Sequence, residues 1–166
     1  MSRAFLVIDI QNDYFPGGVL PLHQPEETEA RLVAAIRQAK EAGDKIILVR
    51  HVSKAAQGLF AAGGTGSEIR PAILAAAGDA PVVTKAVADA FQDTDLGSHL
   101  AGIGELIVTG MMTQNCVVFT AMSKAAERFK VTVAGDLCTA PSEIVHRIAL
   151  NALGSKLMVS NASELF

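Results

Sequence analysis

The sequence predicts an α/β protein, a three-layer α/β/α sandwich around a doubly wound, mostly parallel sheet of six strands. Its apolar runs are short and continuous, which is typical of strands covered on both faces. Helical patterns separate these runs in regular alternation, as in βαβ units. Half of the 166 residues are hydrophobic and no Pro/Ser-rich linker divides the chain, so a single Rossmann-like domain over residues 1–166 is expected.

The strands are predicted from runs of aliphatic and β-branched residues. In order, they are expected at 4–9 (AFLVID), 45–51 (KIILVRH), 81–85 (PVVTK), 105–109 (ELIVT), 130–135 (KVTVAG) and 156–160 (KLMVS). Right-handed crossovers between them would place helices on both faces of the sheet. Ligands of such sheets bind beyond the carboxyl ends of the strands, so the residues at the strand ends are the candidates for a site.

The helices are predicted from apolar stripes at helical spacing. The first stripe consists of Leu32, Ala35, Ile36 and Ala39, and a later one of Ile144, Ile148 and residues 150–153. A third helix is expected to begin after Thr113, a good N-cap residue, and to run to about Arg128.

Charge and composition exclude several classes of partner. The chain has 14 basic and 17 acidic residues and no basic block, so neither nucleic acid nor a membrane surface is expected as a partner. The opening MSRAFLVIDIQND turns polar too early for a signal peptide or a membrane span. Together with only two cysteines, this predicts a cytoplasmic protein with free thiols, and the charge balance favours a small molecule or a protein as its partner. Gly/Ala-rich segments at 55–66 and 72–80 favour a homo-oligomer.

Two ionisable residues stand at expected strand ends. Asp9 follows the first strand, where partial burial can raise its pKa and make it a useful base. The alternative is an aspartate that caps the following turn. Lys85 ends the third strand, a position where a lone lysine is usually a solvated charge.

Cys116 falls where the fourth strand has ended and a helix is beginning. At position N3 of that helix the thiol would feel the positive end of the helix dipole, which lowers a cysteine pKa below its usual ~8.5. A buried free cysteine can also be a small hydrophobe. The expected core stripe argues against that alternative, because Cys116 would point away from Val118, Met122, Ala125 and Phe129. Cys138, expected in a loop after the fifth strand, is interpreted as structural.

A compact parallel sheet can bring the ends of strands one, three and four to one crevice. An acid, a lysine and a thiol would then meet there. This set matches the base, orienting group and nucleophile of covalent catalysis.

Four segments in order resemble motifs of the isochorismatase-like cysteine hydrolases, which include nicotinamidases and N-carbamoylsarcosine amidohydrolase. DIQNDYF resembles D-x-Q-x-D-F, GGTGSEIRP resembles the family's loop after strand two, KAVADAFQDT resembles K-x-x-x-S-A-F-x-x-T, and GMMTQNCV resembles G-x-x-T-x-x-C-V. The resemblance implies Asp9, Lys85 and Cys116 as a catalytic triad that cleaves a C–N bond through a thioester, without a cofactor.

The resemblance implies further features of the site. Met111-Met112 would be a cis peptide, and the backbone N–H groups of Met112 and Cys116 would form an oxyanion hole. Family positions and strand ends suggest six substrate-binding residues: Tyr14, Phe15, His51, Phe60, Phe91 and Gln114. Each has an alternative: His51 could be a satisfied strand-end histidine, Gln114 could support the turn at the helix start, and the aromatic side chains could be core residues.

The chain departs from the nicotinamidases at their metal site. No acid stands two residues before His51, so no metal is expected. Asp89 replaces a common serine and lies near the expected site with no assigned role. Asp136 ends the fifth expected strand, either as a support behind the site or as a loop or helix cap.

Three other functions are compatible with parts of the pattern. Isochorismatases proper act on a non-amide substrate and lack the cysteine, so Cys116 favours amide hydrolysis. A response-regulator-like switch would need paired acids after strand one and a lysine after strand five, which this chain does not have. A thiol-based redox protein would use Cys116, with Cys138 as its partner if the two approach in space.

Overall fold

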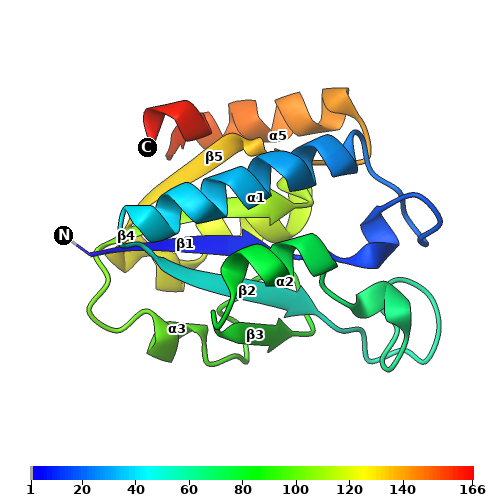
Figure 1. The fold of residues 1–166 in the computed structure, drawn as a ribbon. Coiled ribbons are helices and arrows are strands. Elements are labelled where there is room, and N and C mark those ends of the chain that lie inside the picture. The colour runs from blue at the N-terminus through cyan, green and yellow to red at the C-terminus, as the bar shows by residue number, and fades with distance from the viewer. Residues whose placement is uncertain (1) are drawn as a thin grey trace.

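The computed structural model describes residues 2–166, and its centre is one six-stranded sheet (Figure 1). The strands are β1 (Arg3–Ile8), β2 (Lys45–His51), β3 (Val82–Lys85), β4 (Glu105–Met111), β5 (Lys130–Thr139) and β6 (Met158–Ser160). Their order is β3-β2-β1-β4-β5-β6, and every neighbouring pair is parallel. The doubly wound sheet is thus confirmed, and its order reverses between β1 and β4, where such folds bind ligands.

Helices cover both faces of the sheet and complete three layers. They are α1 (Pro25–Glu41), α2 (Pro71–Ala77), α3 (Leu96–His99), α4 (Val118–Ala121) and α5 (Glu143–Gly154), with short turns η1 (Asn12–Tyr14), η2 (Thr65–Ser67), η3 (Thr113–Val117), η4 (Lys124–Arg128) and η5 (Ala162–Glu164). Alternate residues of β1 enter two separate cores, Phe5 and Val7 with α1 and α2, and Leu6 and Ile8 with α3 to α5. None of the described helices is long and apolar enough to cross a membrane.

The stripe predicted for α1 is confirmed, whereas that for α5 is wrong at Ile144 and Ile148. The four predicted residues of α1 are at most 1% exposed. In α5, by contrast, Ile144 and Ile148 are 70% and 66% exposed, whereas Leu153 of the predicted stripe is buried together with Ala149. The sequence of α5 has apolar residues on two faces, and periodicity alone could not indicate which face meets the sheet.

The long helix predicted after β4 is also wrong. The chain makes a single π-helical turn, η3, then one short α-helix, and breaks at Met122 and Ser123 before η4 begins. The Ser123 side chain accepts a hydrogen bond from the Ala125 N–H and so begins the second helix. The wide first turn changes the buried face, which now includes Cys116, Val117, Thr120 and Ala121, while Met122 is 37% exposed.

Strand β5 is longer than predicted and two loops lie at the carboxyl edge of the sheet. Cys138 lies within β5, not in a loop after it. The carboxylate of Asp13 accepts hydrogen bonds from the N–H of Phe60 (2.7 Å) and of Val19 (3.2 Å), and so joins the loops after β1 and β2. A Cβ at Gly66 would lie 2.3 Å from Asp13 Oδ1, so only glycine allows this close approach.

Candidate active site

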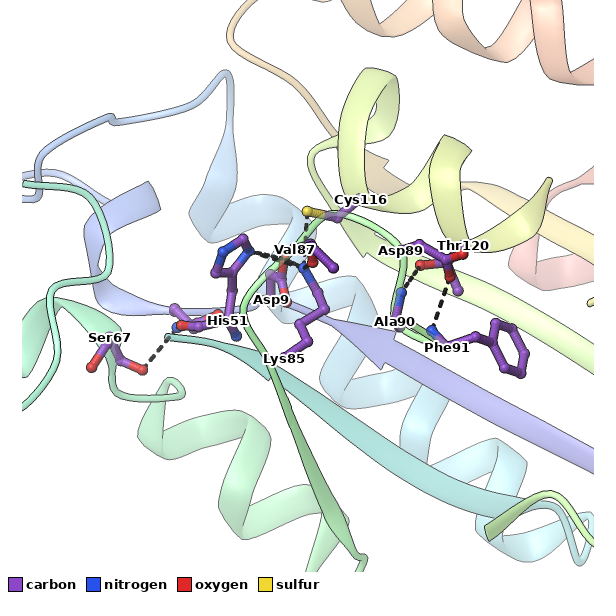
Figure 2. Close-up of polar contacts among 11 residues, drawn as sticks. Asp9, His51, Ser67, Lys85, Val87, Asp89, Ala90, Phe91, Cys116 and Thr120 are labelled. Carbon is purple, nitrogen blue, oxygen red and sulfur yellow. Dashed lines mark hydrogen bonds and ion pairs between the residues drawn. The ribbon is translucent and has the colours of Figure 1, made fainter. Parts of the chain in front are cut away.

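The register of the sheet places the predicted strand-end residues together. Lys85 is the last residue of β3 and pairs with His51, the last residue of β2. Asp9 directly follows β1, has a φ of 54°, and donates its N–H to the Val49 carbonyl at 3.0 Å. Cys116 lies in η3, which directly follows β4. Figure 2 shows these side chains converging at the carboxyl edge of the sheet.

The ammonium group of Lys85 is the centre of this cluster. Its Nζ lies 3.0 Å from Asp9 Oδ2 and from His51 Nδ1, and 3.1 Å from Cys116 Sγ. It also donates to the Val87 carbonyl at 3.0 Å. Lys85 is 2% exposed, so the solvated charge that is usual for a strand-end lysine does not apply here.

Asp9 is fully buried and poorly solvated. Its exposure is 0%, and the charge nearest to its carboxylate is that of Lys85, with Nζ 3.0 Å from Oδ2. Burial therefore raises the pKa of Asp9 above its ordinary 3.8, and the charge of Lys85 opposes that shift only in part. A raised pKa is what a general base at neutral pH requires.

The lowered pKa expected for Cys116 is wrong. The thiol is 1% exposed, and burial, followed by the negative charge of Asp9, raises its pKa to about 12. Lys85 offsets part of this rise. The dipole argument fails because η3 is one wide turn packed in the core and not the first turn of a long helix. At neutral pH Cys116 is a thiol that needs a base.

His51 lies beside the cluster and is half-buried. Burial and the positive charge of Lys85 lower the pKa of its imidazole below 6.5. Its ring lies 5.5 Å from that of Phe60, and Phe60 in turn packs edge-on against Tyr14 at 4.7 Å. These two aromatic residues therefore adjoin the cluster through His51.

The other two aromatic candidates have contacts elsewhere. The guanidinium of Arg70 lies 4.1 Å from the ring centroid of Phe15. Phe91 stacks on Phe129 at 6.3 Å, and Figure 2 shows its ring pointing away from Cys116. These ring contacts do not join Phe15 or Phe91 to Asp9, Lys85 or Cys116. The side chain of Asp89 accepts a hydrogen bond from the Phe91 N–H, so it supports a local turn.

The expected cis peptide at Met111-Met112 is present. No hydrogen bond of residues 2–166 has the Met112 N–H as its donor, so this group is available to a ligand. The side-chain amide of Gln114 donates to Met112 Sδ at 3.5 Å, and its Oε1 is buried without a partner. Gln114 therefore has an acceptor that a substrate N–H could satisfy.

Sequence reasoning missed the role of Gln11. Its Nε2 donates to the His51 carbonyl at 2.7 Å and to the Ser67 carbonyl at 2.8 Å, while its Oε1 accepts the His51 N–H at 2.8 Å. These bonds hold the end of β2 and the following loop in place. The signal was present, since Gln11 and Asp13 both stand in DIQND.

One group of side chains has the spacing of metal ligands. Asp9, His51 and Cys116 form the only such group among the described residues, with donor atoms within 4.8 Å of one another. The Lys85 ammonium, however, lies 3.0 to 3.1 Å from all three of these residues. A cation already sits among them, so the residues present do not fit a metal ion, and its absence stays a prediction.

A separate cavity of about 290 Å³ lies beyond β5 and contains none of the cluster residues. Its lining includes His23, Arg31, Asp136, Cys138 and His146. The hydroxyl of Thr113 is hydrogen-bonded to His146 Nδ1 at 2.7 Å, so Thr113 does not cap a helix as predicted. Asp136 accepts the Ala162 N–H and supports the C-terminal turn rather than the cluster.

Comparisons with known proteins agree on one family. The model of the Isochorismatase domain matches residues 3–162. The uncharacterized isochorismatase family protein YddQ of Bacillus subtilis is 30% identical over 100% of this chain and 99% of its own. An isochorismatase-like hydrolase of Alkaliphilus metalliredigens is 26% identical, with a TM-score of 0.89 over 99% of this chain and 96% of its own. At 22% identity, a nicotinamidase/pyrazinamidase of Bacillus subtilis shares the fold, with a TM-score of 0.84 over 97% of this chain and 100% of its own.

Proposed function

The chain belongs to the isochorismatase family, and from this premise we propose that it is a metal-independent cysteine hydrolase of small molecules. The bond cleaved is a C–N bond of an amide, carbamoyl compound or ureide. One observation carries the proposal: the Lys85 ammonium lies 3.0 Å from the Asp9 carboxylate and 3.1 Å from Cys116 Sγ. A base, a nucleophile and a cation that stabilises both of their anions are thus in one place.

In the first step, the Asp9 carboxylate takes the proton of the Cys116 thiol while sulfur attacks the carbonyl carbon of the substrate. The electron pair of the C=O bond moves to oxygen and forms a tetrahedral oxyanion. The N–H groups of Met112 and Cys116 would stabilise this oxyanion, and loss of one such donor typically costs about 3 kcal/mol. Lys85 stabilises the sulfur while it carries negative charge.

In the second step, the oxyanion collapses and the C–N bond breaks. Protonated Asp9 gives its proton to the leaving nitrogen, so ammonia or an amine departs and a Cys116 thioester remains. Asp9, again a carboxylate, then takes a proton from water as the water oxygen attacks the thioester. The acid product leaves, and the proton returns to the Cys116 sulfur.

An isochorismatase-type reaction on a non-amide substrate is the alternative within the same family. It needs no thiol nucleophile, whereas here the thiol is the group that Lys85 and Asp9 surround. This arrangement favours a covalent C–N hydrolase.

The test is release of ammonia from a panel of primary amides, carbamoyl compounds and ureides. We expect turnover by the wild type and by Cys138→Ser, and none by Cys116→Ser. Cys138 is a matched control because it is also buried, at 3% exposure. Rapid quenching followed by peptide mass spectrometry should find the acyl group on Cys116. Turnover that survives in Cys116→Ser would contradict the covalent mechanism.

A further inference from the structure

The ammonium group of Lys85 has more acceptors than hydrogens. Four acceptor atoms lie within 3.1 Å of its Nζ: one each on Asp9, His51, Val87 and Cys116. An ammonium has three N–H groups, so one acceptor must go without. His51, Val87 and Cys116 each accept a hydrogen bond from Lys85, so Asp9 competes with three other acceptors for three N–H groups.

This distribution has a consequence for Asp9. A carboxylate that accepts hydrogen bonds from an ammonium is stabilised in its charged form and becomes a weaker base. Asp9 has the charge of Lys85 at 3.0 Å, but each N–H that another acceptor takes is lost to Asp9. The charge of Lys85 and the hydrogen bonds from Cys116 and Lys85 oppose the effect of burial only in part, so the pKa of Asp9 stays raised.

His51 is the acceptor that makes this possible. The Lys85 ammonium can only donate, so His51 Nδ1 must present its lone pair and the imidazole must be neutral, with its proton on Nε2. The backbone of His51 is held in place by its hydrogen bonds with Gln11 and by its pairing with Lys85 in the sheet.

We propose that His51 is a positioning residue, which draws one N–H of Lys85 away from Asp9 and so leaves Asp9 a stronger base for the Cys116 thiol. The other two acceptors are a backbone carbonyl and the nucleophile itself. His51 is therefore the acceptor that a substitution can remove without touching either. The inference deepens the proposed function and rests on it for the role of Asp9 as a base.

Four titratable groups face Asp9 from the surrounding elements. They are Lys85 from β3, His51 from β2, Cys116 from η3 and Tyr14 from η1. Burial raises the pKa values of the Tyr14 hydroxyl and the Cys116 thiol, so both stay neutral at neutral pH. In this buried position, Lys85 and His51 are therefore the groups whose charge acts on Asp9, and the Cys116 thiol acts on it through a hydrogen bond.

The test is a carboxyl ¹³C NMR titration of the full chain, labelled at aspartate Cγ, with the Asp9 resonance assigned from Asp9→Asn. His51→Leu removes the acceptor at similar volume, and His51→Asn keeps an oxygen acceptor near the position of Nδ1. In His51→Leu the freed N–H of Lys85 turns to Asp9, so the Asp9 pKa should fall by about one unit or more. His51→Asn should restore the wild-type value.

An Asp9 pKa that is unchanged or raised in His51→Leu would overturn the proposal, and so would equal shifts in both variants, which a purely structural histidine would give. His51→Ala makes the same comparison should the leucine variant not fold. The titration uses no substrate, so its outcome does not depend on whether amide hydrolysis is found. Failure of this inference and failure of the proposed function can therefore be told apart. With an active substrate, His51→Leu should lower kcat/KM about tenfold and His51→Asn should recover it.

Discussion

Asp9 and Cys116 both lie beside the positive charge of Lys85, and in the proposed reaction one proton moves from the Cys116 thiol to the Asp9 carboxylate. Burial raises the pKa of each group, so neither readily loses a proton to the solvent. Transfer of the thiol proton to Asp9 is different, because it moves the negative charge within the cluster and leaves the net charge, with Lys85, unchanged. A thiol pKa of about 12 is thus compatible with catalysis once Asp9 has entered the reaction as a carboxylate.

Replacing Lys85 by methionine should destabilise the fold in a pH-dependent way. Without the ammonium, burial raises the folded-state pKa of Asp9 further above 3.8. Protonated Asp9 is then tolerated at low pH, and stability is lost as pH rises through that folded-state pKa. We expect urea unfolding to show a loss of about 3 to 5 kcal/mol at about pH 9 and a much smaller loss near pH 5.

The double variant Asp9→Asn/Lys85→Met is the control for this prediction. It has no carboxylate to ionise, so its stability relative to the wild type should lose this pH dependence. An equal loss for Lys85→Met at both pH values would show that packing, not charge, is responsible. The same single variant should slow acylation of Cys116.

At the scale of elements, the ends of parallel strands hold the cluster because hydrogen bonds fix where each strand stops. Gln11 forms three hydrogen bonds that join the loop after β1 to the end of β2 and to η2. Gly110 lets β4 approach β1 closely, since a Cβ there would lie 2.1 Å from the Ile8 carbonyl oxygen and its φ is +119°. Asp9 and Cys116 follow these two strands and owe their proximity to this contact.

The variant Gln11→Glu tests how far the Gln11 bonds support the site. The change removes the two N–H groups that Gln11 donates to the carbonyls of His51 and Ser67. It also places a carboxylate next to these two oxygens, so we expect the stability to fall by about 3 kcal/mol. Hydrogen exchange should quicken at the end of β2 before it does elsewhere in the sheet. Gln38→Glu, on the exposed face of α1, is the matched control and should change neither. Unchanged exchange near His51 would contradict the prediction.

The sequence predicts the elements whose signal is local. Continuous apolar runs predict all six strands, and the strand ends point to Asp9, Lys85 and Cys116. The wide turn of η3 was not predictable, because the Thr113 hydroxyl is hydrogen-bonded to His146 of α5. This contact joins segments that are distant in the sequence. The raised pKa of Cys116 was missed for the same reason, since its burial depends on the whole core.

For the whole molecule, the homo-oligomer expected from the sequence stays a prediction. The exposed apolar side chains of Ile144 and Ile148 suggest α5 as the contact surface. Light scattering of Ile144→Lys/Ile148→Lys should then give about the chain mass of 17.3 kDa, and the wild type a multiple of it. Val19→Lys, at an apolar position 58% exposed on a loop, should still assemble. A monomeric wild type would refute the expectation.

The burial of Cys116 also determines how sensitive the protein is to oxidants. Cysteines that sense or suffer oxidation are accessible and largely thiolate, because the thiolate is the form that peroxides attack. Cys116 has the opposite properties, because its side chain is only 1% exposed and its thiol is protonated at neutral pH. These properties weigh against a redox function. They also mean that the fold shields the Cys116 sulfur from oxidants in the surrounding solution.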